Sequence, residues 1–197
     1  MTTSRAAGAL LALGAIALLA ACRGGSPESL TDRACREEHL PAGFERLTFG
    51  NLSRSNMGRE VGAERLEQAG IDGGYFAYWK ERLDRLEDEL ASEIVCQVVA
   101  FGEADEASSF VADLPVEADW LSVTVAGVAL AEGTALAEVE ATAEAGTRAF
   151  RLEEPDGRVR FAVVEARGRF VLSVHFGGPA GEATVGEAVA ILEAMGR

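Results

Sequence analysis

Residues 158–176 read RVRFAVVEARGRFVLSVHF, and this stretch decides the fold. Apolar residues alternate with other residues on both sides of Arg167-Gly168, which has the length of a two-residue hairpin turn. A register centred on that turn gives one apolar face with three cross-strand pairs: Val159–Phe176, Phe161–Val174 and Val163–Leu172. The stretch therefore predicts a β-hairpin with one face turned to the core.

The second face of this hairpin is thinner and more polar. It carries Arg160 opposite His175 and Ala162 opposite Ser173. If no helix covers these four side chains, they form the candidate binding face of the protein.

A turn and a helix flank the hairpin. Upstream, Glu154-Pro155-Asp156-Gly157 is a strong turn signal that joins a third strand over 147–153. Downstream, Thr184 and Glu187 form a capping box. The helix that follows has four inward positions: Val185, Ala188, Val189 and Leu192.

The middle of the chain repeats this pattern. The matching segments are 94–100 with 170–176, and 107–114 with 185–192. The aromatic segment at Tyr75 would then correspond to the strand that begins at Arg158. The repeat predicts an α+β domain made of two related strand-strand-helix halves, with an antiparallel sheet and helices packed mainly on one face.

The remaining elements are predicted less uniformly. We expect a helix over 27–39, a strand over 44–53 with Leu47 and Phe49 on one face, a helix over 59–69 and a strand over 120–126. The stretch 75–90 fits either an aromatic strand or a charged helix, and the repeat favours a strand at its start. For 131–145, a strand, a helix and an irregular connection all remain open.

The first 21 residues have the composition of a secretory signal, with a short basic start and an uncharged run over 6–21. A membrane-spanning helix needs about 20 apolar residues, so this run is short for a permanent span. It ends in Leu19-Ala20-Ala21-Cys22, which closely resembles the lipobox of bacterial membrane lipoproteins. The resemblance implies that residues 1–21 are removed and that the Cys22 thiol carries a diacylglycerol, with acyl chains such as palmitate.

This resemblance implies an arrangement in three segments: a signal peptide over 1–21, a lipidated flexible tether over 22–29 and a single α+β domain over 30–197. The expected location is the extracytoplasmic side of the cell membrane or the outer membrane. The expected partner is then the membrane, to which the lipid on Cys22 anchors the protein.

Two cysteines remain once Cys22 is acylated. An even pair in an exported domain indicates a disulfide, so we expect Cys35 to bond to Cys96. Such a bond would hold the N-terminal helix against the sheet.

The charge balance excludes one class of partner. The chain has 18 basic and 32 acidic residues, a net charge of −14. Such a surface repels phosphate backbones, so we expect no nucleic-acid partner.

Few residues suit catalysis. His39 and His175 are the two histidines, and no nucleophile motif of the Gly-x-Ser-x-Gly type occurs. Glu37-Glu38-His39 would point in different directions on a helix, so no metal site is expected. Four aromatic residues suit either the core or a ligand site: Tyr75, Tyr78, Trp79 and Trp120.

These patterns predict a binding or interaction domain without catalytic, metal or cofactor sites, whose ligand or protein partner is unknown. One alternative is a carrier of an apolar ligand held between sheet and helices. Another is an extracytoplasmic hydrolase or metal-dependent enzyme that uses His175 or His39.

Overall fold

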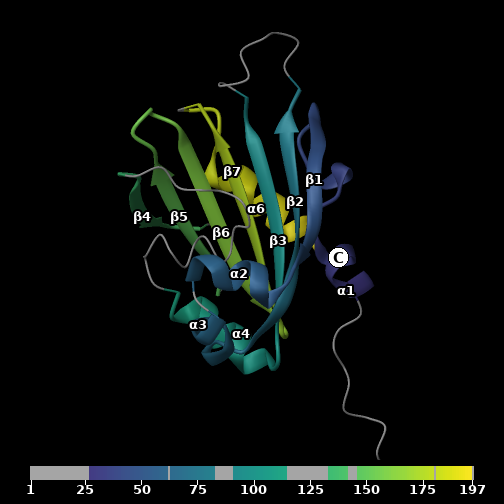
Figure 1. Ribbon diagram of the computed structural model, residues 1–197. Helices are drawn as coiled ribbons and strands as arrows, with labels where there is room; N and C mark the ends of the chain where they lie inside the picture. Colours follow the sequence, from purple (N-terminus) through teal and green to yellow (C-terminus); the bar gives the residue numbers. More distant parts are fainter. Residues whose placement is uncertain are drawn as a thin grey trace, which may run out of the picture.

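The computed structural model describes residues 27–61, 63–82, 91–114, 133–141, 146–179 and 181–196. The described strands form one antiparallel sheet of seven strands in the order β1-β2-β3-β7-β6-β5-β4 (Figure 1). The strands are β1 (Phe44–Leu52), β2 (Ile71–Glu81), β3 (Glu93–Phe101), β4 (Ala135–Val139), β5 (Arg148–Glu153), β6 (Val159–Arg167) and β7 (Phe170–Gly178). The helices are α1 (Pro27–Arg33), the 3-10 turn η1 (Glu37–His39), α2 (Arg54–Val61), α3 (Ala63–Gln68), α4 (Ala104–Ala112) and α6 (Val185–Ala194). The predicted α+β class with an antiparallel sheet is confirmed.

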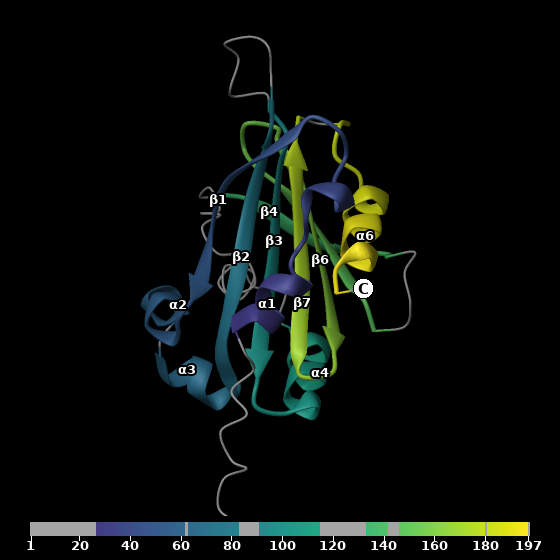
Figure 2. The ribbon, with the colours of Figure 1, turned by 90° about the vertical axis from the view of Figure 1, so that its right-hand side faces the viewer.

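The helices pack on both faces of the sheet, so the expectation of helices mainly on one face is wrong in this respect. The disulfide face, which includes Ile94, Cys96 and Val174, is covered by α1 and α6. The α4 face, which includes Val99 and Phe101, is covered by α3 and α4 (Figure 2). The reason is that β3 and β7 are buried on both faces, and each face needs a cover.

The β6–β7 hairpin forms, but its register differs by two residues from the expected one. Phe161 pairs with Phe176 and Val163 with Val174, around a turn at Gly168-Arg169. Gly168 has a φ of 59°, and the first central position of the usual two-residue hairpin turns needs such a positive φ. A two-residue shift keeps every side chain on its face, so the predicted apolar face is right although its pairs are wrong.

The predicted repeat is visible in the strands. The β2–β3 and β6–β7 hairpins meet at the centre of the sheet, where β3 pairs with β7 from Glu93–Gly177 to Ala100–Phe170. Each hairpin is followed by a helix, α4 or α6. These two helices lie on opposite faces, so the strands follow the repeat and the helices depart from it.

The N-terminal segment forms two short helical turns instead of the continuous helix expected over 27–39. Between α1 and η1 the chain places Cys35 against β3, where it forms the predicted disulfide with Cys96. The two Cα atoms are 5.8 Å apart, and the cysteines are 61 residues apart in the chain. In the chain-entropy model, closing a loop of this length stabilises the fold by about 4 kcal/mol.

Several other expected elements are present. The strands over 44–53 and 147–153 are β1 and β5, and the turn at Glu154–Gly157 is closed by a hydrogen bond from Gly157 N to Glu154 O of 2.9 Å. Thr184 caps α6, because its Oγ1 accepts a hydrogen bond of 3.2 Å from Glu187 N.

For 75–90 and 131–145, where the sequence allowed more than one conformation, the structure shows a strand in part of each segment. β2 occupies the aromatic part of 75–90, and β4 lies within 131–145. The helix expected over 59–69 corresponds to α2 and α3, with Leu66 fully buried. The signal peptide, Cys22, most of the tether and the strand expected over 120–126 lie outside the described residues.

Candidate functional site

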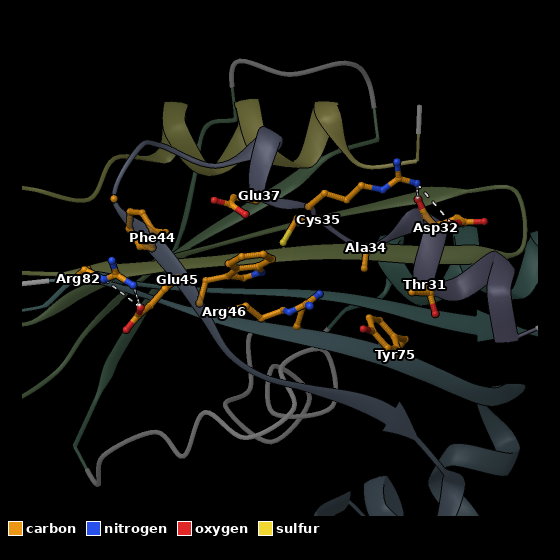
Figure 3. A pocket seen from close by; sticks show the side chains of 14 residues that line it. Thr31, Asp32, Ala34, Cys35, Glu37, Phe44, Glu45, Arg46, Tyr75 and Arg82 are labelled. Atoms are coloured by element: carbon orange, nitrogen blue, oxygen red, sulfur yellow. Dashed lines mark hydrogen bonds and ion pairs between the residues drawn. The ribbon is translucent and has the colours of Figure 1, made fainter.

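A cleft of about 630 Å³ opens on the disulfide face, between the α1–η1 segment and the first two strands (Figure 3). Its floor is formed by alternate residues of β2, which are Tyr75, Ala77 and Trp79. Because side chains alternate along a strand, these three point to the same face. One wall includes Cys35, so the disulfide to Cys96 fixes the distance between wall and floor.

The edge strand β1 supplies the other side of the cleft. The β1–β2 register shifts between Arg46 and Thr48, so that Arg46 pairs with Trp79 and Phe49 pairs with Ala77. Because Trp79 and Ala77 share a face, this shift brings Arg46 and Phe49 to the same face, although their spacing in a regular strand would separate them. Leu47 lies at the shift itself. Leu47 and Phe49 are 51% and 56% exposed.

Two arginines of the cleft are already paired with carboxylates. Arg82 donates to Glu45 Oε2 from Nε (3.1 Å) and Nη2 (2.6 Å). Arg36 lies 3.6 Å from the carboxylate of Asp32. Figure 3 shows Arg82 and Glu45 at one end of the cleft, Tyr75 at the other and Arg46 between them.

Arg46 is in a different situation. Its guanidinium carbon lies 4.6 Å from the ring centre of Phe49 and 5.6 Å from that of Trp79, distances typical of cation–π contacts. Within the described ranges, no carboxylate oxygen lies within ion-pair distance of it. Its N–H donors are therefore not engaged by an acidic side chain of this part of the protein.

Trp79 and Tyr75 add polar atoms to an aromatic floor. Trp79 is only 4% exposed, and its Nε1 has no hydrogen-bond partner among the described residues. Leaving such a buried donor unsatisfied costs about 1–3 kcal/mol. Burial raises the pKa of Tyr75, while the positive charge of Arg46 opposes that rise.

A second hollow of about 530 Å³ lies between α3 and α4. Its polar lining includes the carboxylates of Asp105, Glu106 and Asp113. Glu106 is used internally, because it accepts a hydrogen bond from Glu103 N at the start of α4. The residues that line this hollow include no arginine, whereas the cleft beside α1 has Arg46 next to two aromatic rings and is the stronger candidate site.

The face predicted for binding is not open. Arg160, Ala162, Ser173 and His175 share a face as expected, but they are 9%, 0%, 1% and 3% exposed. The expected contact face is therefore corrected to a buried layer. The register shift also changes its pairs, because Ala162 lies opposite His175 and Arg160 lies opposite Gly177.

The charges of this buried layer are paired with one another. Arg160 contacts Glu154 at 2.5 Å and Glu93 at 3.0 Å, and Arg158 contacts Glu93 at 2.9 Å. Tyr78 donates its hydroxyl hydrogen to Glu93. Burial, together with this hydrogen bond and the charge of Glu93, raises the pKa of Tyr78 to about 12.

The two histidines lie on different faces of the sheet and have different surroundings. Burial, and secondarily the charge of Arg160, lowers the pKa of His175 to about 3, and neither ring nitrogen has a hydrogen-bond partner in the described structure. A neutral and enclosed imidazole is poorly placed to exchange protons with a substrate at neutral pH. His39 Nδ1 accepts a hydrogen bond from Arg36 N and thereby closes η1.

The structure brings together residues that the sequence patterns left apart. Of the four aromatic residues named above, Tyr75 and Trp79 line the cleft, Tyr78 faces the opposite side, and Trp120 lies outside the described ranges. Arg46 was not predicted, and the only local signal for it is its position beside aromatic residues in an edge strand. The described residues contain no group of three His, Cys, Asp or Glu side chains that could hold a metal ion. In the same ranges, no helix has the length and apolar character needed to cross a membrane.

No protein-family model matches the chain, and no curated protein matches it in sequence. Among solved structures, the chain is similar to the extracellular domain of PknH from Mycobacterium tuberculosis, with a TM-score of 0.56 and 13% sequence identity. The alignment covers 86% of this chain and 95% of that chain. At this level of identity the likeness shows a shared fold.

Proposed function

We propose that this protein is a bacterial lipoprotein, anchored through Cys22 on the extracytoplasmic side of a membrane, whose folded domain binds a small ligand without catalysis. The observation that carries the proposal is the cleft beside α1, which combines an aromatic floor with the guanidinium of Arg46, a group that has no carboxylate within ion-pair distance among the described residues. Its volume lies within the range of small-molecule sites, which is about 300–1,000 Å³.

Three observations support the proposed location. The lipobox at Leu19–Cys22 implies export and acylation. The Cys35–Cys96 disulfide is typical of oxidising compartments outside the cytoplasm. The fold is also that of a domain described as extracellular.

The anchor is tested by Cys22→Ala. We expect this variant to lack the acyl mass and to remain uncleaved by the lipoprotein pathway, with an unchanged melting temperature of the folded domain. The measurement is an intact mass spectrum together with detergent-phase partitioning. A variant that is still processed and still partitions as a lipoprotein would contradict the anchor.

Ligand binding is tested by native mass spectrometry of the protein extracted gently from its own membrane. We expect additional non-covalent mass on the wild type, and its loss in Ala77→Phe, which fills the cleft floor. Thr48→Phe is the matched control, because Thr48 is an exposed residue of β1 that pairs with Tyr78 on the opposite face. If Ala77→Phe fails to fold, Thr31→Trp on the opposite wall serves the same purpose. A wild-type protein that carries no added mass, and gains none when returned to the membrane extract, would contradict the binding function.

A further inference from the structure

We infer that the cleft selects compact ligands that combine an anionic group with a flat apolar group, and that Arg46 binds the anionic group. This inference rests on the proposed function, because it concerns the same cleft. It adds the chemical class of the ligand and the residue that determines it.

The cations of the cleft are all arginines in the described structure. Three arginines line the cleft, which are Arg36, Arg46 and Arg82. Arg82 is held by Glu45 through two donors, and Arg36 lies beside Asp32. Arg46 alone of these three has no carboxylate within ion-pair distance in the described ranges, so it is the cation available to an incoming anion.

Arg46 is held beside two aromatic rings. Its guanidinium carbon lies near two ring centres, those of Phe49 and Trp79, so contacts with these rings restrict the positions that the group can take. A guanidinium presents a planar fork of donors that matches carboxylate and phosphate oxygens, and stacking leaves the edges of that fork open. Restricting the side chain beforehand also reduces the entropy lost on binding.

The cleft also offers a surface for the apolar part of a ligand. Tyr75 and Trp79 form an aromatic floor beside Arg46. A flat group on this floor would contact the aromatic side chains while its anionic end reaches the guanidinium. The cleft volume of about 630 Å³ lies in the range of sites that hold a molecule of this kind.

The overall charge of the protein opposes the binding of an anion. With a net charge of −14, the long-range field attracts cations and repels anions. Glu37 also lines the cleft. A preference for anions must therefore come from the local contact with Arg46.

The test uses three probes that share one ring system: phenylacetate (anionic), phenylacetamide (neutral) and 2-phenylethylamine (cationic). Each is titrated into the full chain isolated from its membrane in a non-ionic detergent. Calorimetry gives Kd, and the indole ¹H–¹⁵N resonance of Trp79, assigned with Trp79→Phe, reports occupation of the cleft. We expect phenylacetate to shift this resonance and to bind about tenfold more tightly than phenylacetamide, the ratio expected for a charge-assisted hydrogen bond.

Two variants assign the effect to one residue. Arg46→Gln should reduce the preference for phenylacetate to about twofold or less, because it removes the charge-assisted hydrogen bond. Arg151→Gln is the matched control, since it removes an equal charge from an ion-paired arginine of β5, outside the cleft lining, and it should keep the preference.

The outcomes separate this inference from the proposed function. If phenylacetamide or 2-phenylethylamine shifts the Trp79 resonance and binds as tightly as phenylacetate, the anion preference is overturned while ligand binding in the cleft stands. Equal losses in Arg46→Gln and Arg151→Gln would overturn the role of Arg46. If no probe shifts the Trp79 resonance, the inference is overturned and the cleft loses its support as the ligand site.

Discussion

The two hairpins at the centre of the sheet share a sequence pattern but are covered in different ways. The β6–β7 hairpin lies between two helices, because α6 packs on its disulfide face and α4 packs on its other face. The β2–β3 hairpin is covered on the disulfide face by α1, a helix of seven residues that is joined to β3 by the disulfide. The cleft lies on this less completely covered half of the molecule.

The connections between strand and helix explain this difference. After β3, two residues lead directly into α4, and Phe101 packs against Phe110 of that helix with ring centres 5.2 Å apart. After β7, the longer connection over 179–184 leads to α6 on the opposite face. In the repeat, Phe101 of β3 aligns with Gly177 of β7. Gly177 has no side chain that could pack against a helix. A repeated strand pattern therefore does not determine where the following helix packs.

The largest expected effect comes from breaking the contact that holds α4 on its face. Phe101→Ala should destabilise the fold by about 3–5 kcal/mol, because Phe101 is fully buried and its removal leaves a cavity. Chemical denaturation measures the change. Phe49→Ala, at an exposed aromatic residue of the sheet edge, should change stability by less than about 0.5 kcal/mol. Equal losses in the two variants would contradict the assignment of Phe101 to the core.

The second effect tests the separate attachment of α1. Reducing the Cys35–Cys96 disulfide should lower the free energy of unfolding by about 2–4 kcal/mol, with the loop-closure entropy as its cause. Amide hydrogen exchange should show the loss of protection first in α1 and β2, while β6 and β7 keep theirs. Uniform loss of protection across both hairpins would contradict the independent cover of the N-terminal half.

The third effect concerns the buried layer on the C-terminal half. The folded-state pKa of His175 is about 3, below its ordinary value of 6.5, so below pH 6.5 the unfolded chain binds a proton that the folded chain does not. Stability from this group is complete above pH 6.5 and falls as the pH drops towards 3, by roughly 2 kcal/mol at pH 5.

Urea denaturation of wild type and His175→Leu at pH 7.5 and pH 5 measures this term, because other titrating groups are common to both proteins. The wild type should lose more stability than the variant on acidification. An identical loss would show that His175 is accessible to protons in the folded state.

Sequence patterns predicted the faces of the hairpin and failed on its register for a physical reason. Gly168 suits either central position of the turn, and the two registers place every residue on the same face. The pattern also assigned the second face of the hairpin wrongly, because Arg160, Ser173 and His175 are polar and yet buried. Alternation with polar residues predicts an exposed side only where those residues stay in water, and here the polar side is buried as well.

The cleft was harder to predict than the fold. Tyr75 and Trp79 have the spacing of core residues, and both are indeed largely buried. Arg46 joins them only because the β1–β2 register shifts beside it, which no alternation rule indicates. The disulfide was predictable because the pairing follows from the number of cysteines once Cys22 is assigned to the anchor.

The position of the disulfide also determines how force would travel through an anchored molecule. A pull on the N-terminus of the proposed lipoprotein can detach α1, but the covalent bond at Cys35 then transmits the tension to Cys96 in β3. β3 is an interior strand, hydrogen-bonded on one side to β2 and on the other to β7. Tension therefore enters the sheet at an interior strand, where two rows of hydrogen bonds resist it, and the edge strand β1 is not peeled away first.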